Sequence, residues 1–176
     1  MSEITAQEAH SLMHSIYLGT LKNESRITKK ILEAVPADKC EYRPHPVSKS
    51  ANELVRHIAA AENRFLETVI NGVFDVNAAT IPEKVKTPKE VAAWYEEQFA
   101  RNFEALTKLS GEQLTKIVDF RGLFQRPAWT FVMLGIHHSI HHRGQLSAYL
   151  RCMDAKVPSI YGESYDDAEA RKAAQA

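Results

Sequence analysis

The chain has 176 residues, of which 44% are hydrophobic and 25% are charged, a composition that excludes a disordered or low-complexity protein. Its 22 basic and 22 acidic residues balance, and no basic block alternates with aromatic residues, so we expect no direct nucleic-acid partner. No apolar run approaches the ~20 residues that span a bilayer, and the first residues lack the basic-then-apolar pattern of a signal peptide. We therefore expect one domain over residues 1–176, with no membrane partner and a cytoplasmic location.

The first half of the chain predicts two long helices. The first runs from about Thr5 to Ala34, because apolar residues recur at helical spacing and a proline then stops the hydrogen-bond ladder. The second begins after Ser50, since Glu53 three residues later completes the S-x-x-E capping box, and its apolar face continues to Gly72. This second helix carries His57.

A third helix and a hairpin are predicted next. The helix begins after Thr87, where Glu90 repeats the capping box and a proline occupies the favoured first helical position, and Gly111 marks its end. Segment 116–129, "KIVDFRGLFQRPAW", mixes β-branched and aromatic residues around an Arg-Gly pair. This pattern predicts a short hairpin.

Pro127 is predicted to start a fourth helix, which holds a cluster of histidines. The segment after Met153 is predicted to form an irregular arm that packs through Ile160 and Tyr161. Long helices joined by medium loops, without alternation of strands and helices, favour an all-α fold. We therefore expect an antiparallel four-helix bundle with a short hairpin before its last helix.

The stretch "GIHHSIHHRGQL", residues 135–146, holds four of the eight histidines of the chain. Residues four apart share one face of a helix, and two imidazoles at this spacing can grip one metal ion. Two such pairs occur, His137 with His141 and His138 with His142, about 100° apart around the helix axis, so one ion cannot use all four. A third ligand has to come from another helix, and His57 is the only histidine within the second one.

Periodicity does not choose between the two pairs. The clearest apolar stripe of the fourth helix points away from His138 and His142, but other apolar residues share their side. Hydrogen-bonded structural histidines are therefore an alternative to a metal site. Other architectures fit worse, because the zincin H-E-x-x-H, the E-x-x-H pairs of di-iron bundles, the nucleophile elbow, the Walker loop and the dinucleotide fingerprint are all missing from the sequence.

At this point the sequence resembles the DinB superfamily of DNA-damage-inducible-like proteins, which also includes thiol-transferase relatives. The residues that carry the resemblance are "ELVRHIAAAENRFL" and "HHSIHHRGQLSAYLR", with "RPHPVSKSANEL" before the first motif and "VPSIYG" in the tail. The resemblance implies a four-helix bundle that commonly pairs into homodimers. It also implies a divalent metal ion, most often zinc or nickel, bound by His57, His138 and His142.

The resemblance gives the neighbouring residues supporting roles. His141, with His137, becomes a structural residue or an outer partner of the ligands. Gln145, one turn beyond His142, would orient a metal-bound water or substrate, and the alternative is a solvated glutamine. Arg143 fits better as a packing and ion-pair residue.

Three neutral imidazoles leave one position of a metal ion open, which is the arrangement of a catalytic site. A bound low-molecular-weight thiol would become a thiolate that attacks an electrophile, and a bound water could instead hydrolyse a small substrate. The resemblance favours the thiol S-transferase. A non-catalytic metal-binding stress-response protein and a metal-dependent hydrolase are the alternatives, and a haem protein fits worse. Glu62 is a weak candidate for an acid or base, since it lies about 140° around the helix from His57.

Overall fold

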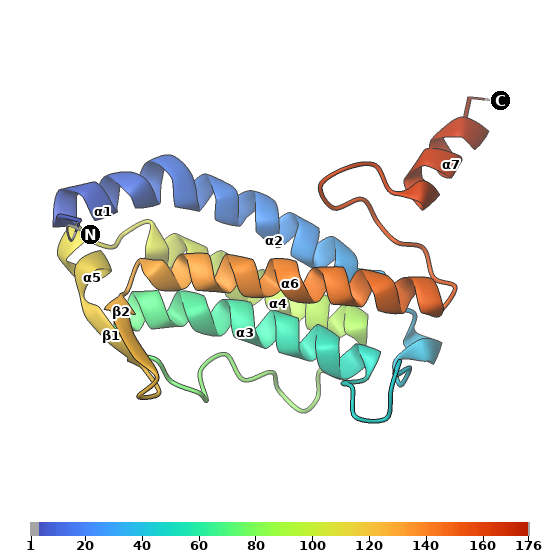
Figure 1. The fold of residues 1–176 in the computed structure, drawn as a ribbon, viewed down its shortest axis with the longest axis horizontal. Coiled ribbons are helices and arrows are strands. Elements are labelled where there is room, and N and C mark those ends of the chain that lie inside the picture. Colours follow the sequence, from blue (N-terminus) through green and yellow to red (C-terminus); the bar gives the residue numbers. More distant parts are fainter. Residues whose placement is uncertain (1–3, 176) are drawn as a thin grey trace.

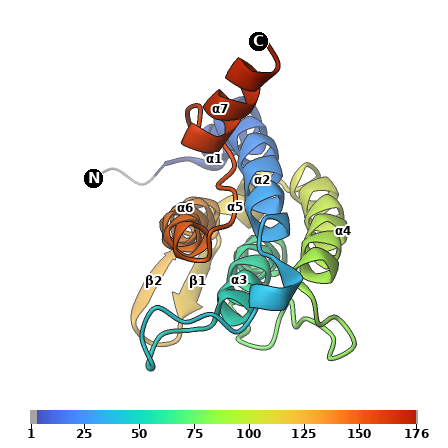
Figure 2. The ribbon, with the colours of Figure 1, turned by 90° about the vertical axis from the view of Figure 1, so that its right-hand side faces the viewer.

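The computed structural model describes residues 4–175, and the bundle in it consists of α1–α2, α3, α4 and α6 (Figures 1 and 2). Helix α2 continues α1 through a π-helical turn, and a short antiparallel hairpin precedes α6. The elements are α1 (Ala6–Leu12), the π-turn (Met13–Tyr17), α2 (Leu18–Glu33), a 3₁₀ turn (Ala37–Lys39), α3 (Ala51–Asn71), α4 (Pro88–Leu106), α5 (Gly111–Thr115), β1 (Ile117–Phe120), β2 (Phe124–Pro127), α6 (Thr130–Cys152) and α7 (Tyr165–Ala173).

The all-α four-helix bundle is confirmed, and so are the predicted caps of its central helices. Ser50 and Glu53 form a reciprocal capping box at α3, and Thr87 and Glu90 form another at α4. Each box satisfies backbone N–H groups that the first turn leaves without partners, which fixes where the helix begins. Each long helix then turns its apolar face inward, and the largest apolar side chains of the core are almost fully buried: Met13, Leu21, Ile31, Leu32, Leu54, Ile58, Leu66, Tyr95, Leu106, Leu114 and Phe131.

The directions of the helices differ from a simple antiparallel bundle. The segment between α3 and α4 runs back along α3, since its Ala78 carbonyl accepts from Arg64 and its Val85 carbonyl accepts from Arg56, two turns earlier on the helix. Helix α4 therefore starts beside the amino-terminal end of α3, and the two helices point the same way (Figure 1). The prediction missed this because the medium length of the connection did not reveal that it spans the bundle.

The first helix contains a wide turn that the periodicity did not predict. The Leu18 N–H donates to the carbonyl of Met13, five residues earlier. One extra residue in the turn shifts the buried face, so Ala9 and Met13 point inward before it, and Leu18 and Leu21 point inward after it. The turn keeps a long helix in register with the core.

The predicted hairpin is confirmed, but its second strand extends to the residue predicted to start the last helix. Strands β1 and β2 pair from Ile117 with Pro127 to Phe120 with Phe124. Pro127 therefore ends a strand, and α6 begins three residues later at Thr130. Gly111 likewise opens the short helix α5 and does not end α4, and a side chain there would collide with the carbonyl oxygen of Ala6, 2.1 Å from an ideal Cβ.

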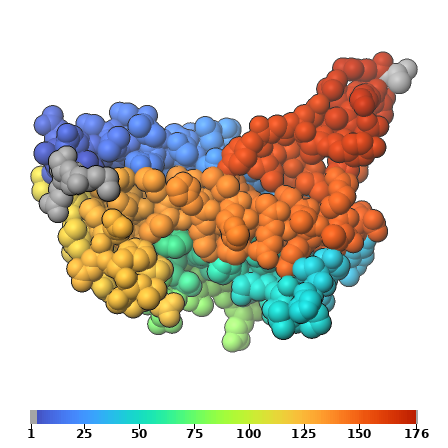
Figure 3. All heavy atoms as spheres, viewed as in Figure 1, coloured from blue at the N-terminus to red at the C-terminus, as the bar shows by residue number. Residues whose placement is uncertain are grey.

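The tail after α6 was predicted as an irregular arm, and its last part is instead the helix α7. The Ser164 hydroxyl accepts from the Asp167 N–H, and acidic residues at the start of the helix with basic residues at its end complement its dipole. No side chain of α7 is buried. The arm stands away from the bundle (Figure 3), and no helix of the described residues is long and apolar enough to cross a membrane.

Candidate metal centre

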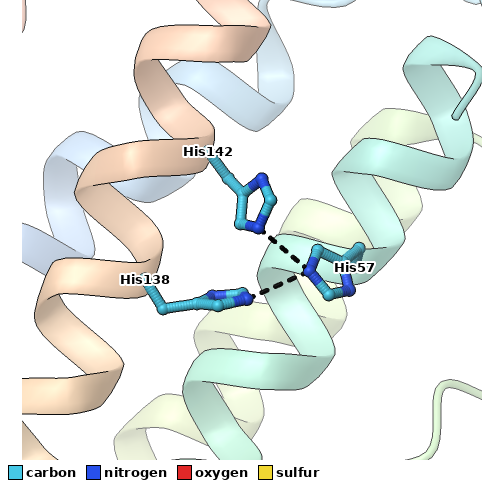
Figure 4. A group of neighbouring side chains, drawn as sticks. All are labelled: His57, His138 and His142. Atoms are coloured by element: carbon cyan, nitrogen blue, oxygen red, sulfur yellow. Dashed lines mark hydrogen bonds between the residues drawn. The ribbon is translucent and has the colours of Figure 1, made fainter. Parts of the chain in front are cut away.

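Three imidazoles meet between α3 and α6, and all three point their Nε2 atoms at one another (Figure 4). His57 lies on α3, and His138 and His142 lie one turn apart on α6. The Nε2 atom of His57 is 3.1 Å from that of His142 and 3.0 Å from that of His138. One ligand atom from each residue falls within 4.8 Å of the other two, so the three histidines could hold a metal ion.

The close approach of α3 and α6 depends on a glycine. Gly135 lies one turn before His138, and a Cβ at this position would be 3.0 Å from the Cβ of Phe65. A larger residue would push the helices apart at the level of the histidines. The Phe65 ring also packs edge-on against His138 at 5.8 Å between centroids, which helps to hold that imidazole.

Gln145 fixes the orientation of one imidazole. Its Oε1 lies 3.0 Å from the Nδ1 atom of His142. An amide oxygen only accepts hydrogen bonds, so Nδ1 carries the proton and the lone pair of Nε2 faces the other two histidines. A partner of this kind, behind the ligand, is typical of metal-binding histidines.

Burial keeps these imidazoles neutral. Desolvation, and next the mutual repulsion of the protonated rings, lowers the pKa of His57 to about 4 and that of His138 to about 3. Desolvation also lowers the pKa of His142, although the bond to Gln145 opposes this shift. Two cations add to the effect, since Lys49 acts on His57 and His142, and Arg64 acts on His57 and His138. The neutral form is the form that binds metal ions.

The geometry and the chemistry of the three donors fit a divalent ion. Two nitrogens bound to one zinc ion at about 2.0–2.1 Å in a tetrahedral arrangement lie about 3.3 Å apart, close to the distances from His57. Imidazoles suit zinc, nickel, copper and iron alike. The buried Nδ1 of His138 has no hydrogen-bond partner among the described residues, so packing alone orients that ring.

The other histidines of the cluster lie outside this group. His137 and His141 are both exposed on the outer side of α6. The His141 ring packs against the His142 ring at 4.8 Å between centroids, and His137 lines an apolar groove with Trp129. The structure thus brings His57 together with His138 and His142, and not with His137 or His141.

Glu62 takes no part in the group. It is buried, and its carboxylate accepts from Tyr95 at 2.6 Å, from Ser139 at 2.5 Å and from Thr28 at 3.3 Å. Burial raises its pKa. Its bonds thus tie α3 to α2, α4 and α6 in the interior of the bundle.

Arg143 is also buried, directly after His142 in the chain. It pairs with the carboxylate of Glu24 and donates to the Tyr161 hydroxyl at 2.6 Å. The expected ion-pair role is therefore confirmed. The Tyr161 side chain is largely exposed, but one face of its ring lies under the Arg143 guanidinium at 5.5 Å, and Ile160 packs against the core, so the tail contacts the bundle at both predicted residues.

A basic cleft beside His57 was not predicted from the sequence. Its wall includes Lys49, Arg56 and Arg64. The available signal was the spacing of Arg56, Ala60 and Arg64, which are four residues apart and so share a face of α3. The spacing alone does not single out these arginines, because only the fold places the 72–87 segment alongside them.

Comparisons with known proteins agree with the fold and the motifs. The family model described as "DinB family" matches residues 6–174. The uncharacterized protein YjoA of Bacillus subtilis (strain 168) is 30% identical over 133 residues, which cover 72% of this chain and 82% of YjoA.

The solved structures that are similar to this chain include two DinB-like proteins. A DinB-like protein from Bacillus cereus has a TM-score of 0.69 at 26% identity, over 82% of this chain and 95% of that one. The structure of Bacillus subtilis YjoA has a TM-score of 0.70 at 24% identity, over 84% of this chain and 99% of that one, and it supports the fold. With the family model covering nearly all of the sequence, the chain belongs to the DinB family.

Proposed function

We propose that this protein binds a divalent metal ion, zinc or nickel, through His57, His138 and His142, and that it is a transferase for a low-molecular-weight thiol. The convergence of the three Nε2 atoms carries the proposal. When bound, such an ion supplies an open coordination position at which a thiol is held as the thiolate, ready to attack an electrophilic carbon.

The residues of the chain prepare the site for this chemistry. His57 and His138 stay neutral at physiological pH because their pKa values lie near 4 and 3. Gln145 holds the lone pair of His142 on the centre, and its amide NH₂ group remains able to donate to a substrate. The half-buried position of the triad keeps part of the bulk water away from a reactive thiolate.

The thiol reaction is favoured over hydrolysis by the neighbours of the triad. Metal-dependent hydrolysis commonly uses a carboxylate near the metal as a general base. Among the described residues, the triad forms hydrogen bonds only within itself and with Gln145, and the buried carboxylate of Glu62 is engaged elsewhere. A thiolate needs no such base once it has formed.

The proposal includes the homodimer that the family resemblance implies. An apolar groove on the outer side of α6, lined in part by Trp129, Met133 and Leu134, would be covered by a second copy. Light scattering on the purified protein tests this, and a Met133→Glu variant should be monomeric. A monomeric wild type would exclude the dimer.

Cobalt substitution tests the thiol proposal, because the spectrum of bound Co²⁺ reports its ligands. We expect cysteine or glutathione to add a sulfur-to-metal charge-transfer band, and the loaded protein to accelerate conjugation of the thiol to an electrophile such as a haloarene. His57→Ala should abolish both effects, whereas His137→Ala should retain them. A loaded protein whose spectrum no thiol changes would contradict the transferase and support the non-catalytic alternative.

A further inference from the structure

A cleft of about 510 Å³ opens beside His57, between the outer face of α3 and the loops on either side of it. This volume falls within the range of about 300–1,000 Å³ that is usual for sites of small molecules. Its wall comes from three segments: the loop before α3, which contributes Arg43 and Lys49, helix α3, which contributes Glu53, Arg56, His57 and Arg64, and residues 79–81 of the loop after α3.

The charges of this cleft are strongly unbalanced. Four cations line it with a single carboxylate, that of Glu53. This carboxylate is engaged by Arg43 at 2.8 Å and by the Ser50 N–H at 2.7 Å. No carboxylate of residues 4–175 lies within ion-pair distance of the three other cations, Lys49, Arg56 and Arg64. Since the whole chain has a formal net charge of zero, the excess of positive charge is local.

The two arginines are held in place by neutral groups. Arg56 donates to the carbonyls of Val85 and Ile81, and the Nε of Arg64 donates to the Ala78 carbonyl at 3.1 Å. Carbonyl oxygens orient a guanidinium but leave its charge without a counter-charge. The terminal nitrogens of Arg64 make no hydrogen bond with the described residues, and the same is true of the Lys49 ammonium group. Both groups are therefore able to bind a ligand.

Lys49 and Arg64 lie on opposite sides of His57. Lys49 precedes the start of α3, and Arg64 lies two turns beyond His57 on that helix. Each is near enough to influence His57 and one histidine of α6, Lys49 acting on His142 and Arg64 acting on His138. An acidic group held by either cation would keep the rest of a small molecule next to the triad.

We propose that this cleft binds a carboxylate or phosphate group of the substrate, with Lys49 and Arg64 as the residues that recognise it. The inference rests on the proposed function, because it names the chemical class of a molecule that reacts at the triad. Fixed cations beside a reaction centre give both specificity for acidic substrates and faster capture of them. Arg64 suits a two-pronged contact with either acidic group, whereas Lys49 contributes a point charge.

Titration of the full-length protein with simple anions tests the proposal. Inorganic phosphate and succinate are added separately, with succinamide as the uncharged match, to metal-free and metal-loaded protein. Nuclear magnetic resonance follows the Nε–Hε signal of Arg64 and the backbone signals around His57. We expect at least one anion, and not succinamide, to shift these signals in both forms, and the preferred anion separates a phosphate from a carboxylate substrate.

The variants make the test specific. At least one of the variants Lys49→Gln and Arg64→Gln should weaken anion binding by about tenfold, the lower end of what a charge-assisted contact contributes. Arg121→Gln, at the exposed tip of the hairpin, should bind like the wild type. The Lys49 side chain makes no hydrogen bond within residues 4–175, and the bond that its carbonyl accepts from Tyr149 does not depend on the side chain, so the variant leaves the fold intact. Equal affinity of the wild type and both cleft variants, or no binding of either anion, would overturn the inference.

Metal content, measured on the same samples, separates the two proposals. Both cleft variants should keep the metal of the wild type, because neither residue belongs to the triad. Anion binding in a protein that takes up no metal would leave the cleft standing and refute the metal site. Full metal content without anion binding would support the metal site and refute the cleft as an anion site.

Discussion

Two pairs of polar residues occupy adjacent positions on α6, Ser139 with Arg143 and His138 with His142. The two pairs have opposite kinds of partner. Ser139 and Arg143 are buried and meet groups of complementary character, the carboxylates of Glu62 and Glu24. His138 and His142 meet another imidazole, so that like atoms face one another. Complementary partners stabilise a fold, whereas three neutral imidazoles whose Nε2 atoms converge provide lone pairs that a cation can bind. The comparison separates the structural half of this polar cluster from its candidate functional half.

The largest effect on stability is expected at the buried ion pair of Arg143 and Glu24. Arg143→Ala removes one member of a buried ion pair and should lower the free energy of unfolding by about 3–5 kcal/mol. The matched control is Arg151→Ala, since Arg151 pairs with Asp166 at the surface and should cost at most about 1 kcal/mol. Urea unfolding of the two variants measures both values. Equal losses would mean that the buried pair has no special structural role.

The second effect is a stabilisation of the folded protein by zinc, and it depends on the three histidines. Zinc at 100 times its dissociation constant should stabilise the wild-type protein by about 2.7 kcal/mol, because only the folded state presents the complete triad. The shift in melting temperature on adding zinc should disappear in His57→Ala and persist in Arg151→Ala. A stabilisation by zinc that survives in His57→Ala would place the ion elsewhere.

A smaller effect is expected from the residue that orients His142. Gln145→Ala should weaken metal binding by about tenfold, the lower end of what the loss of such a partner costs. Gln145→Glu keeps an acceptor for the Nδ1 proton and should restore most of the affinity. The control is Gln125→Ala on β2, where the side chain is exposed. Competition with a chromophoric chelator measures all three variants, and an unchanged affinity in Gln145→Ala would make this glutamine a merely solvated residue.

The last effect is a pH dependence of the metal-free protein. His57 and His138 have pKa values near 4 and 3 in the folded state, against 6.5 without burial, so the unfolded chain binds more protons between these values. Stability should therefore be fully present above pH 6.5 and decline as the pH falls toward 4. Burial raises the pKa of Glu62, which acts in the opposite sense, so the informative comparison is with His57→Asn. Thermal unfolding of this variant should show a shallower decline, and an identical decline would contradict the neutral triad.

Local sequence patterns predicted much of the fold because helix ends are set by local chemistry. The capping boxes at Ser50 and Thr87 and the hairpin between Ile117 and Pro127 lie where they were expected. The missed features depend on contacts distant in the sequence. The π-turn after Leu12 adjusts a long helix to the core, and the parallel course of α3 and α4 follows from a connection whose path only packing determines.

The candidate site was predictable only in part. Spacing identified two histidine pairs, and the family resemblance, not periodicity, selected His138 and His142. Periodicity failed because the buried face of α6 includes the polar residues Ser139 and Arg143, while the apolar Met133 and Leu134 lie in a surface groove outside that face. The basic cleft was not predicted because it forms only when the two loops, one of which carries Lys49, fold beside the face of α3 that holds His57 and Arg64.

The most direct test of the metal site is elemental analysis of the purified, untagged protein. The samples are the wild type, the His138→Ala/His142→Ala double variant and the matched His137→Ala/His141→Ala double variant, each reconstituted with zinc or nickel. We expect one divalent ion per chain in the wild type and in the His137→Ala/His141→Ala variant, and none in the His138→Ala/His142→Ala variant. Equal metal content in all three samples, or no metal in the wild type, would contradict it.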